Sequence, residues 1–144
     1  MQQRTPAPVS ALLLCCALWM GAGFSCAADS QPKIIRDHEL RDNRWREFNA
    51  IRDEFVRNVF PGCISRSKLK LTCAGCEYIY ITVRITIDAD GKMSGYTKVK
   101  ENVCGRSAPA ALERCFIEYL ESITFPRNLR SMIIETNLGN GLKC

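Results

Sequence analysis

The sequence predicts an α+β domain in which two helices pack on a β-sheet and disulfide bonds hold the fold together. Three observations lead to this fold class. One stretch alternates like a strand, two stretches repeat apolar residues at helical spacing, and six cysteines remain once an N-terminal export signal is set aside. The expected order of elements is helix, strand, strand, helix, strand.

Residues 1–28 are typical of a secretory signal peptide. Arg4 is followed by the uncharged stretch Val9–Phe24, and Cys26 and Ala28 place small residues ahead of a cut after Ala28. We therefore expect a periplasmic or secreted protein with no stable membrane insertion after cleavage. A retained N-terminal anchor and a lipoprotein attached through Cys26 are the alternatives.

The remaining residues are enough for one modest domain. Residues 1–28 contain one of the 20 basic and none of the 15 acidic side chains, so the rest of the chain has a net charge of +4. This excess is mild, and no basic cluster interleaves with aromatic residues, so we expect no nucleic-acid partner. We expect residues 29–36 to be a short linker and residues 37–144 to form a single domain.

An amphipathic helix is expected from about Asp37 to the pair Pro61-Gly62. Its apolar residues recur at spacings of three or four, among charges of both signs, which favours a core-facing helix over a membrane-surface helix. The apolar stripe consists of Trp45, Phe48, Ile51, Phe55 and Val59.

Two strands joined by a tight turn follow this helix. Tyr78–Ile87 alternates between isoleucine or valine on one face and half-polar residues on the other. "DADGK", Asp88–Lys92, is typical of a hairpin turn, and a second strand is expected at Met93–Glu101. The turn resembles a calcium loop only superficially, because its glycine comes at position four instead of six, so we expect no metal.

A second helix and a last strand complete the domain. Ser107 is the expected N-cap, Pro109 lies in the first turn, and Pro126 stops the helix. The last strand is expected at about Ser131–Leu138. The buried face of the helix is expected to comprise Leu112, Cys115, Phe116, Tyr119, Leu120 and Ile123.

The cysteines decide between classes of function. An even number in a short exported chain predicts three disulfides, with fifteen alternative pairings. Cys73 and Cys76 also form a Cys-x-x-Cys pair, so a thiol–disulfide oxidoreductase is the enzymatic alternative. The pair runs into a strand, however, and lacks the helix N-terminus that lowers a thiol pKa. The six cysteines are Cys63, Cys73, Cys76, Cys104, Cys115 and Cys144.

Other catalytic and cofactor sites find no support in the sequence. Glu77 stands where a c-type haem needs histidine after Cys76, and His38 is the only histidine, which argues against zinc and against a histidine-based catalytic group. We expect His38 to be a solvated surface residue. No cofactor and no enzymatic activity are expected.

The run "YITVRITIDADGKMSGYTKVKENV…APAALERCFIEYLESITFP" with the final strand resembles the TonB C-terminal domain superfamily, most closely the AgmX/PglI-type C-terminal domains. The matching features are the strand and turn Val83–Lys92, Cys115 on the inner face of a helix, and Phe125-Pro126 after it. The resemblance covers roughly Val59 to Leu138. It implies a three-stranded antiparallel sheet of order 2-1-3, two helices on one face, and protein–protein contact in the bacterial envelope by capture of a partner strand.

We therefore expect an exported, non-enzymatic protein-binding or adaptor domain of the cell envelope. About eight residues separate Asp29 from the first helix, and the long proline-rich spacer of a full TonB is missing, so energy transduction is not expected. An inhibitor or immunity-type protein and a structural cell-wall component are the alternatives.

In this fold the last strand runs beside the first strand, which predicts the disulfide pairing. We expect Cys144 to pair with Cys73 or Cys76 and the other of these two to pair with Cys63. Cys104 and Cys115 would then form the third bridge.

The same fold predicts a partner-binding edge at the last strand. The second strand carries Lys98 and Lys100, which protect an edge against pairing, whereas the last strand is less protected. The alternative is that this edge is covered by the "GNGLKC" tail or by the second copy in a homodimer. The expected edge residues are Met132, Ile133, Ile134, Glu135, Thr136 and Asn137.

Overall fold

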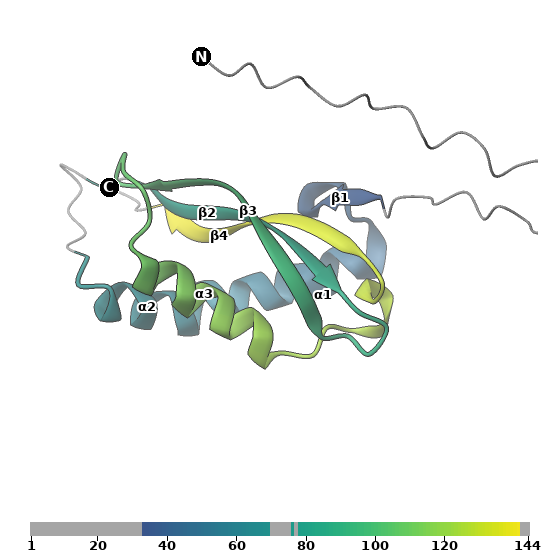
Figure 1. Cartoon of the computed structure of the whole chain (residues 1–144). Helices are drawn as coiled ribbons and strands as arrows, with labels where there is room; N and C mark the ends of the chain where they lie inside the picture. Colours follow the sequence, from purple (N-terminus) through teal and green to yellow (C-terminus); the bar gives the residue numbers. More distant parts are fainter. Residues whose placement is uncertain (1–32, 70–75, 77, 142–144) are drawn as a thin grey trace, which may run out of the picture.

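The computed structural model describes residues 33–69, 76 and 78–141. In these residues a β-sheet forms one layer, and the helices form a second layer against one of its faces (Figure 1). The strands are β1 (Ile34–Arg36), β2 (Tyr78–Ile87), β3 (Met93–Val103) and β4 (Ile133–Gly141), and the α-helices are α1 (Asp42–Glu54), α2 (Phe60–Arg66) and α3 (Ala110–Ser122). The α+β fold class is confirmed.

The sheet has the strand order β1-β4-β2-β3. The three expected strands therefore lie in the expected order, with β2 between β3 and β4 and antiparallel to both. Alternate residues of β2 are almost fully buried against the helices, as the alternation in the sequence predicted. These residues are Ile79, Ile81, Val83, Ile85 and Ile87.

The fourth strand was not expected. Ile34–Arg36, which the sequence placed in a linker, pairs in parallel with Ile133–Glu135 of β4. Three residues are too few to show a period in sequence, and the pairing comes from Ile35, which packs against the core, and from backbone contacts to a distant part of the chain. The sheet is mixed for this reason.

The expected end of the first helix at Pro61-Gly62 is wrong. A 3-10 turn, η1 (Asp37–Glu39), precedes α1, and a π-helical turn, η2 (Phe55–Val59), joins α1 to α2, which ends only at Arg66. In η2 the Phe60 N–H donates to the Phe55 carbonyl, five residues back. This wider turn accommodates Pro61, which has no N–H and would collide with the preceding turn of a regular α-helix.

The apolar stripe of the first helix is correct except at Trp45. Phe48 and Phe55 are buried, and Ile51 and Val59 are partly buried against the core, but Trp45 is 49% exposed. At 100° per residue Trp45 lies about 60° from Phe48 around the helix and about 80° from Phe55. It therefore falls on the flank of the buried face.

The aromatic side chains of three helical segments meet at the centre of this core. The Phe55 ring lies edge-on to the Phe116 ring, with centroids 4.9 Å apart, and it also contacts Phe60 and Tyr119. Such pairs contribute roughly 1 kcal/mol beyond the area that they bury. This cluster explains why α2 continues past Pro61: tertiary packing outweighs the local signal for a stop.

The second helix begins later than expected. Its N-cap is Pro109 and not Ser107. A β-bridge between Val103 and Arg106 extends the end of β3, so the residues just before Pro109 belong to that extension and not to the helix. The expected inner face is otherwise confirmed, with Leu112, Cys115, Phe116 and Leu120 buried, Tyr119 and Ile123 partly buried, and Ile117 added.

Candidate functional site

Two disulfides tie the elements together. Cys63 of α2 is bonded to Cys115 of α3, with a Cα–Cα distance of 5.6 Å, and Cys76 is bonded to Cys104, with a Cα–Cα distance of 4.2 Å. The expected bridge between Cys104 and Cys115 is wrong, as is the expected pairing of Cys63 with Cys73 or Cys76. The physical reason is the longer helix, since α2 continues along α3 and brings Cys63 to Cys115.

The second bridge shows how one cysteine of the Cys-x-x-Cys pair is bonded. Cys104 follows β3, where its N–H donates to the carbonyl of Tyr78 at the start of β2, and Cys76 lies just ahead of that strand. Cys76 is therefore bonded neither to Cys73 nor to Cys144. Cys73 and Cys144 lie outside the described residues.

These bonds indicate an oxidising compartment outside the cytoplasm. Of the helices in residues 33–69 and 78–141, none combines the length and the apolar character needed to cross a membrane.

The expected binding edge is partly occupied. β1 pairs with Ile133, Ile134 and Glu135, so these residues do not form a free edge, and Met132 precedes the strand. Beyond Glu135 no strand of the described residues pairs with the outer side of β4, which continues through Thr136–Gly141. Of the residues expected to form this edge, Thr136 and Asn137 lie in β4 beyond the pairing with β1.

The hydrogen-bond pattern shows which backbone groups face outward on this edge. The Ile87 N–H donates to the Met132 carbonyl at 2.9 Å, and bonded and non-bonded pairs then alternate along the antiparallel register. Thr136 and Leu138 thus direct their backbone groups to β2, whereas Asn137 directs its N–H and carbonyl away from β2. Asn137 is exposed.

The side chains near this edge are fixed by hydrogen bonds across the sheet. The Thr136 hydroxyl donates to a carboxylate oxygen of Asp37, which is also 3.3 Å from the Arg52 guanidinium. The Thr82 hydroxyl and the Asn137 amide oxygen are 2.6 Å apart. These contacts order the side chains beside the point where β1 ends.

The face of the sheet that points away from the helices is polar and basic. We call it the open face: it comprises the outward side chains of β2, namely Tyr78, Tyr80, Thr82, Arg84 and Thr86, and their partners on neighbouring strands. Glu135 lies between two arginines there, 2.7 Å from Nε of Arg84 and 3.8 Å from Nε of Arg36. Sequence analysis placed Arg84 on the half-polar face of its strand but could not place Arg36 beside it.

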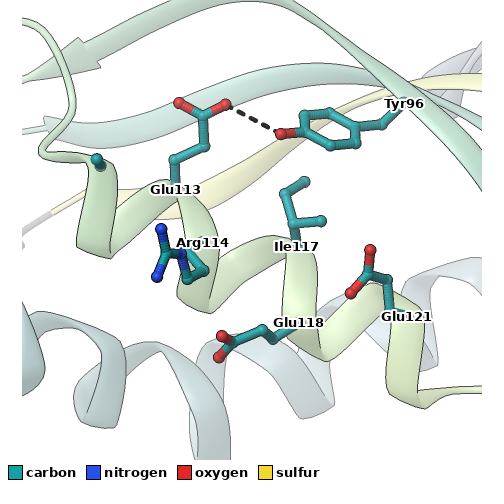
Figure 2. Close-up of a pocket in the computed structure, with 7 residues that line it drawn as sticks. Tyr96, Glu113, Arg114, Ile117, Glu118 and Glu121 are labelled. Carbon is teal, nitrogen blue, oxygen red and sulfur yellow. Dashed lines mark hydrogen bonds between the residues drawn. The ribbon is translucent and has the colours of Figure 1, made fainter.

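On the helix side, a groove of about 570 Å³ lies between β3 and α3. Figure 2 shows the hydroxyl of Tyr96 pointing to Glu113, to which it donates a hydrogen bond of 3.3 Å, with Glu118 and Glu121 farther along α3. Glu113 also accepts from Lys98 at 2.9 Å, and Glu118 lies 3.8 Å from the Arg66 guanidinium. Glu113 and Glu118 therefore act in ion pairs and do not form a pair of free carboxylates.

The charges of this groove shift each other's pKa values. Hydrogen bonds to Glu113 and Glu101 raise the pKa of Lys98, and the hydrogen bond from Lys98 lowers the pKa of Glu101. Burial, followed by the charge of Glu113, raises the pKa of the Tyr96 hydroxyl. All three shifts favour the ionisation states that these groups have at neutral pH.

The other residues considered from the sequence have local roles. His38 is exposed, as expected, and its Nδ1 lies 3.6 Å from Asp37. Asp88 closes the hairpin turn by accepting hydrogen bonds from the backbone N–H groups of Asp90 and Lys92. Within the described part of the chain, no group of three or more His, Cys, Asp or Glu is arranged to hold a metal ion.

In comparisons with known proteins, no protein family model, no curated protein and no solved structure matches the chain.

Proposed function

We propose that this protein is an exported, non-enzymatic binding domain of the bacterial cell envelope that captures a segment of a protein partner as an added strand. The observation that carries the proposal is the outer side of β4. β1 occupies only Ile133–Glu135 of this strand, and the row of backbone groups continues through Thr136–Gly141. A partner segment would continue the line of β1 along this row.

The pairing of β1 supports this mode of binding. It is a parallel addition of three residues, with two isoleucines and Arg36, to the same edge that a partner would use. The outer side of β4 therefore already holds one extended segment. At the opposite side of the sheet, β3 is interrupted by two register shifts and carries Lys98 and Lys100, features that protect an edge from pairing.

Export and the TonB-like relationship belong to the same proposal. The disulfides support a compartment such as the periplasm, where the chain would begin at Asp29 after loss of the signal peptide, and the mass of the exported protein checks this start. The strand order β3-β2-β4 with helices on one face agrees with the arrangement that the resemblance implies. An adaptor of the envelope is the role that we favour.

The test is a pair of substitutions at Asn137. Asn137→Pro removes the outward N–H and leaves the bonds between β4 and β2 in place, whereas Asn137→Thr also loses the side-chain contact to Thr82 but keeps the N–H. Protein exported to the periplasm is recovered with its partners by affinity capture and cross-linking. We expect the proline variant to lose a partner that the threonine variant and the wild type retain.

Equal recovery of every partner by both folded variants would show that no strand is added at this edge. Circular dichroism and a thiol count establish that each variant is folded and oxidised before the comparison is made.

A further inference from the structure

The open face of the sheet carries more positive than negative charge. Arg36 of β1, Arg84 of β2 and Lys100 of β3 lie on it, and Glu135 of β4 is the carboxylate that the described residues place among them. The register sets this arrangement, because Arg36 and Arg84 both pair with Glu135 and Lys100 pairs with Thr82.

The hydrogen-bonding capacity of these cations is only partly used. Glu135 contacts Arg84 and Arg36 through Nε, and among the described residues no other acceptor contacts either guanidinium. Their side chains are 41% and 62% exposed. Each guanidinium therefore keeps the two terminal nitrogens that bind a carboxylate in the bidentate geometry.

Lys100 has no carboxylate partner among the described residues. Its Nζ lies 5.5 Å from the centre of the Tyr80 ring, a cation–π contact on the open face. Lys98, two residues earlier, lies on the opposite face and is held by both Glu101 and Glu113. The same strand thus neutralises its lysine on the helix side and leaves the lysine on the open side available.

The surface around these cations is suited to an extended segment. Tyr78 is 57% exposed, and Gly139 lies opposite Tyr80 in the register without a side chain of its own. No helix of the described residues covers this side of the sheet, since all three pack against the other face (Figure 1). Arg84 and Lys100 lie near each other on adjacent strands, because Lys100 pairs with Thr82, which precedes Arg84 by two residues on the same face of β2.

We propose that the open face binds an acidic segment of a protein partner, in which carboxylates at alternate positions contact Arg84 and Lys100. A carboxylate is the ligand that we expect, because the anion that already lies between the two guanidiniums on this face is the carboxylate of Glu135. The inference rests on the proposed function, as it assigns a charge to the partner, but it concerns side chains of the open face and not the backbone of the β4 edge.

The experiment measures binding of a fluorescent peptide in which glutamate alternates with serine, by anisotropy, at low and at physiological salt. Arg84→Gln/Lys100→Gln is compared with Arg57→Gln/Arg114→Gln, which removes the same charge from the exposed surfaces of η2 and α3. Because an exposed ion pair contributes up to a few-fold in affinity, we expect the first variant to raise Kd about tenfold. The control should change Kd by less than about twofold.

Lys100→Gln alone is a second test variant, chosen because it breaks no ion pair between described residues and should leave the fold intact. It should raise Kd about threefold. An equal loss in the control variant, or no binding by the wild type, would overturn the inference. Tighter binding of oligothymidylate or dextran sulfate through the same two residues would also overturn it, in favour of a nucleic acid or a polysaccharide. A partner that Asn137→Pro loses but Arg84→Gln/Lys100→Gln retains would support strand addition at β4 and contradict the acidic-segment proposal, so each proposal can fail alone.

Discussion

Gly139 lies in β4 at a point where the backbone of β2 leaves no room for a side chain. Its φ is +147°, and a Cβ added there would lie 2.0 Å from the carbonyl oxygen of Ile79 and 2.6 Å from Cα of Tyr80. Because the obstacle is the backbone of the central strand, it cannot move without disturbing the sheet. Gly139→Ala should therefore lower the free energy of unfolding by roughly 3 kcal/mol or more, measured by denaturant titration.

Gly62 provides the matched control. It is exposed in α2, and a Cβ added there meets nothing within 4 Å. Gly62→Ala should raise the free energy of unfolding by about 0.5–1 kcal/mol, because alanine favours the helix and restricts the unfolded chain. If both alanines had the same small effect, the close approach at Gly139 would be refuted.

The partly buried hydroxyl of Tyr119 makes the stability of the fold depend on pH. Its hydroxyl donates to the Ile51 carbonyl at 3.0 Å, and burial, followed by the charge of Glu54, raises its pKa above 10.0. The raised pKa means that the folded state holds the proton more tightly than the unfolded state. The stabilisation is complete below the pKa of the unfolded chain and is lost as the pH rises through the folded value.

We therefore expect Tyr119→Phe to cost about 1 kcal/mol near neutral pH, the usual net value of such a bond. The difference between variant and wild type should shrink above about pH 10, where the unfolded tyrosine ionises. Denaturant unfolding at several pH values, with absorbance of tyrosinate as a second signal, measures both effects. A difference that stays constant up to high pH would contradict the assigned role of the hydroxyl.

At the scale of elements, the disulfide pairing is the sharpest prediction. Non-reducing proteolysis and mass spectrometry should yield a peptide joining Cys63 to Cys115 and another joining Cys76 to Cys104. The sequence separations are 52 and 28 residues, so loop closure predicts a stabilisation of roughly 4 and 3.5 kcal/mol respectively. Recovery of a Cys104–Cys115 peptide would contradict the packing of α2 along α3.

Sequence analysis found the elements that have a period or follow a clear turn. β2 alternates over ten residues and α3 has helical spacing over thirteen, and their buried faces are correct apart from the addition of Ile117. β3 has no such alternation and was found from the hairpin turn that precedes it. The errors occur where a long-range contact overrides a local signal. Pro61 predicts a helix end, but the π turn and the packing of Phe55 on Phe116 keep the chain helical.

The wrong disulfide pairing follows from the wrong prediction of a helix end at Pro61. With a helix that ends at Pro61, Cys63 would lie in a loop free to reach the start of the first strand. With α2 continuing to Arg66, Cys63 is fixed in the core opposite Cys115. The sheet edge was misjudged for a similar reason, because the three residues of β1 acquire their conformation only from β4.

At the scale of the whole molecule, β1 joins the beginning of the described chain to its last strand. Ile35 packs against the core, Arg36 lies 3.8 Å from Glu135, and the pairing covers Ile133–Glu135. A three-residue strand buries little apolar surface and its ion pair is exposed, so its contribution should be modest. The remaining sheet, β4-β2-β3, keeps all of the buried face of β2 without it.

A chain that begins at Asp37 should therefore still fold cooperatively but with a free energy of unfolding roughly 1–2 kcal/mol lower than a chain that begins at Lys33. Hydrogen exchange gives the sharper readout. In the shorter chain the amides of Ile133 and Glu135, which face β1, should exchange much faster, whereas the amide of Ile134, which faces β2, should stay protected. Equal protection in both chains would mean that β1 does not pair with β4 in solution. Loss of protection at Ile134 as well would mean that the three-residue strand holds the whole sheet together.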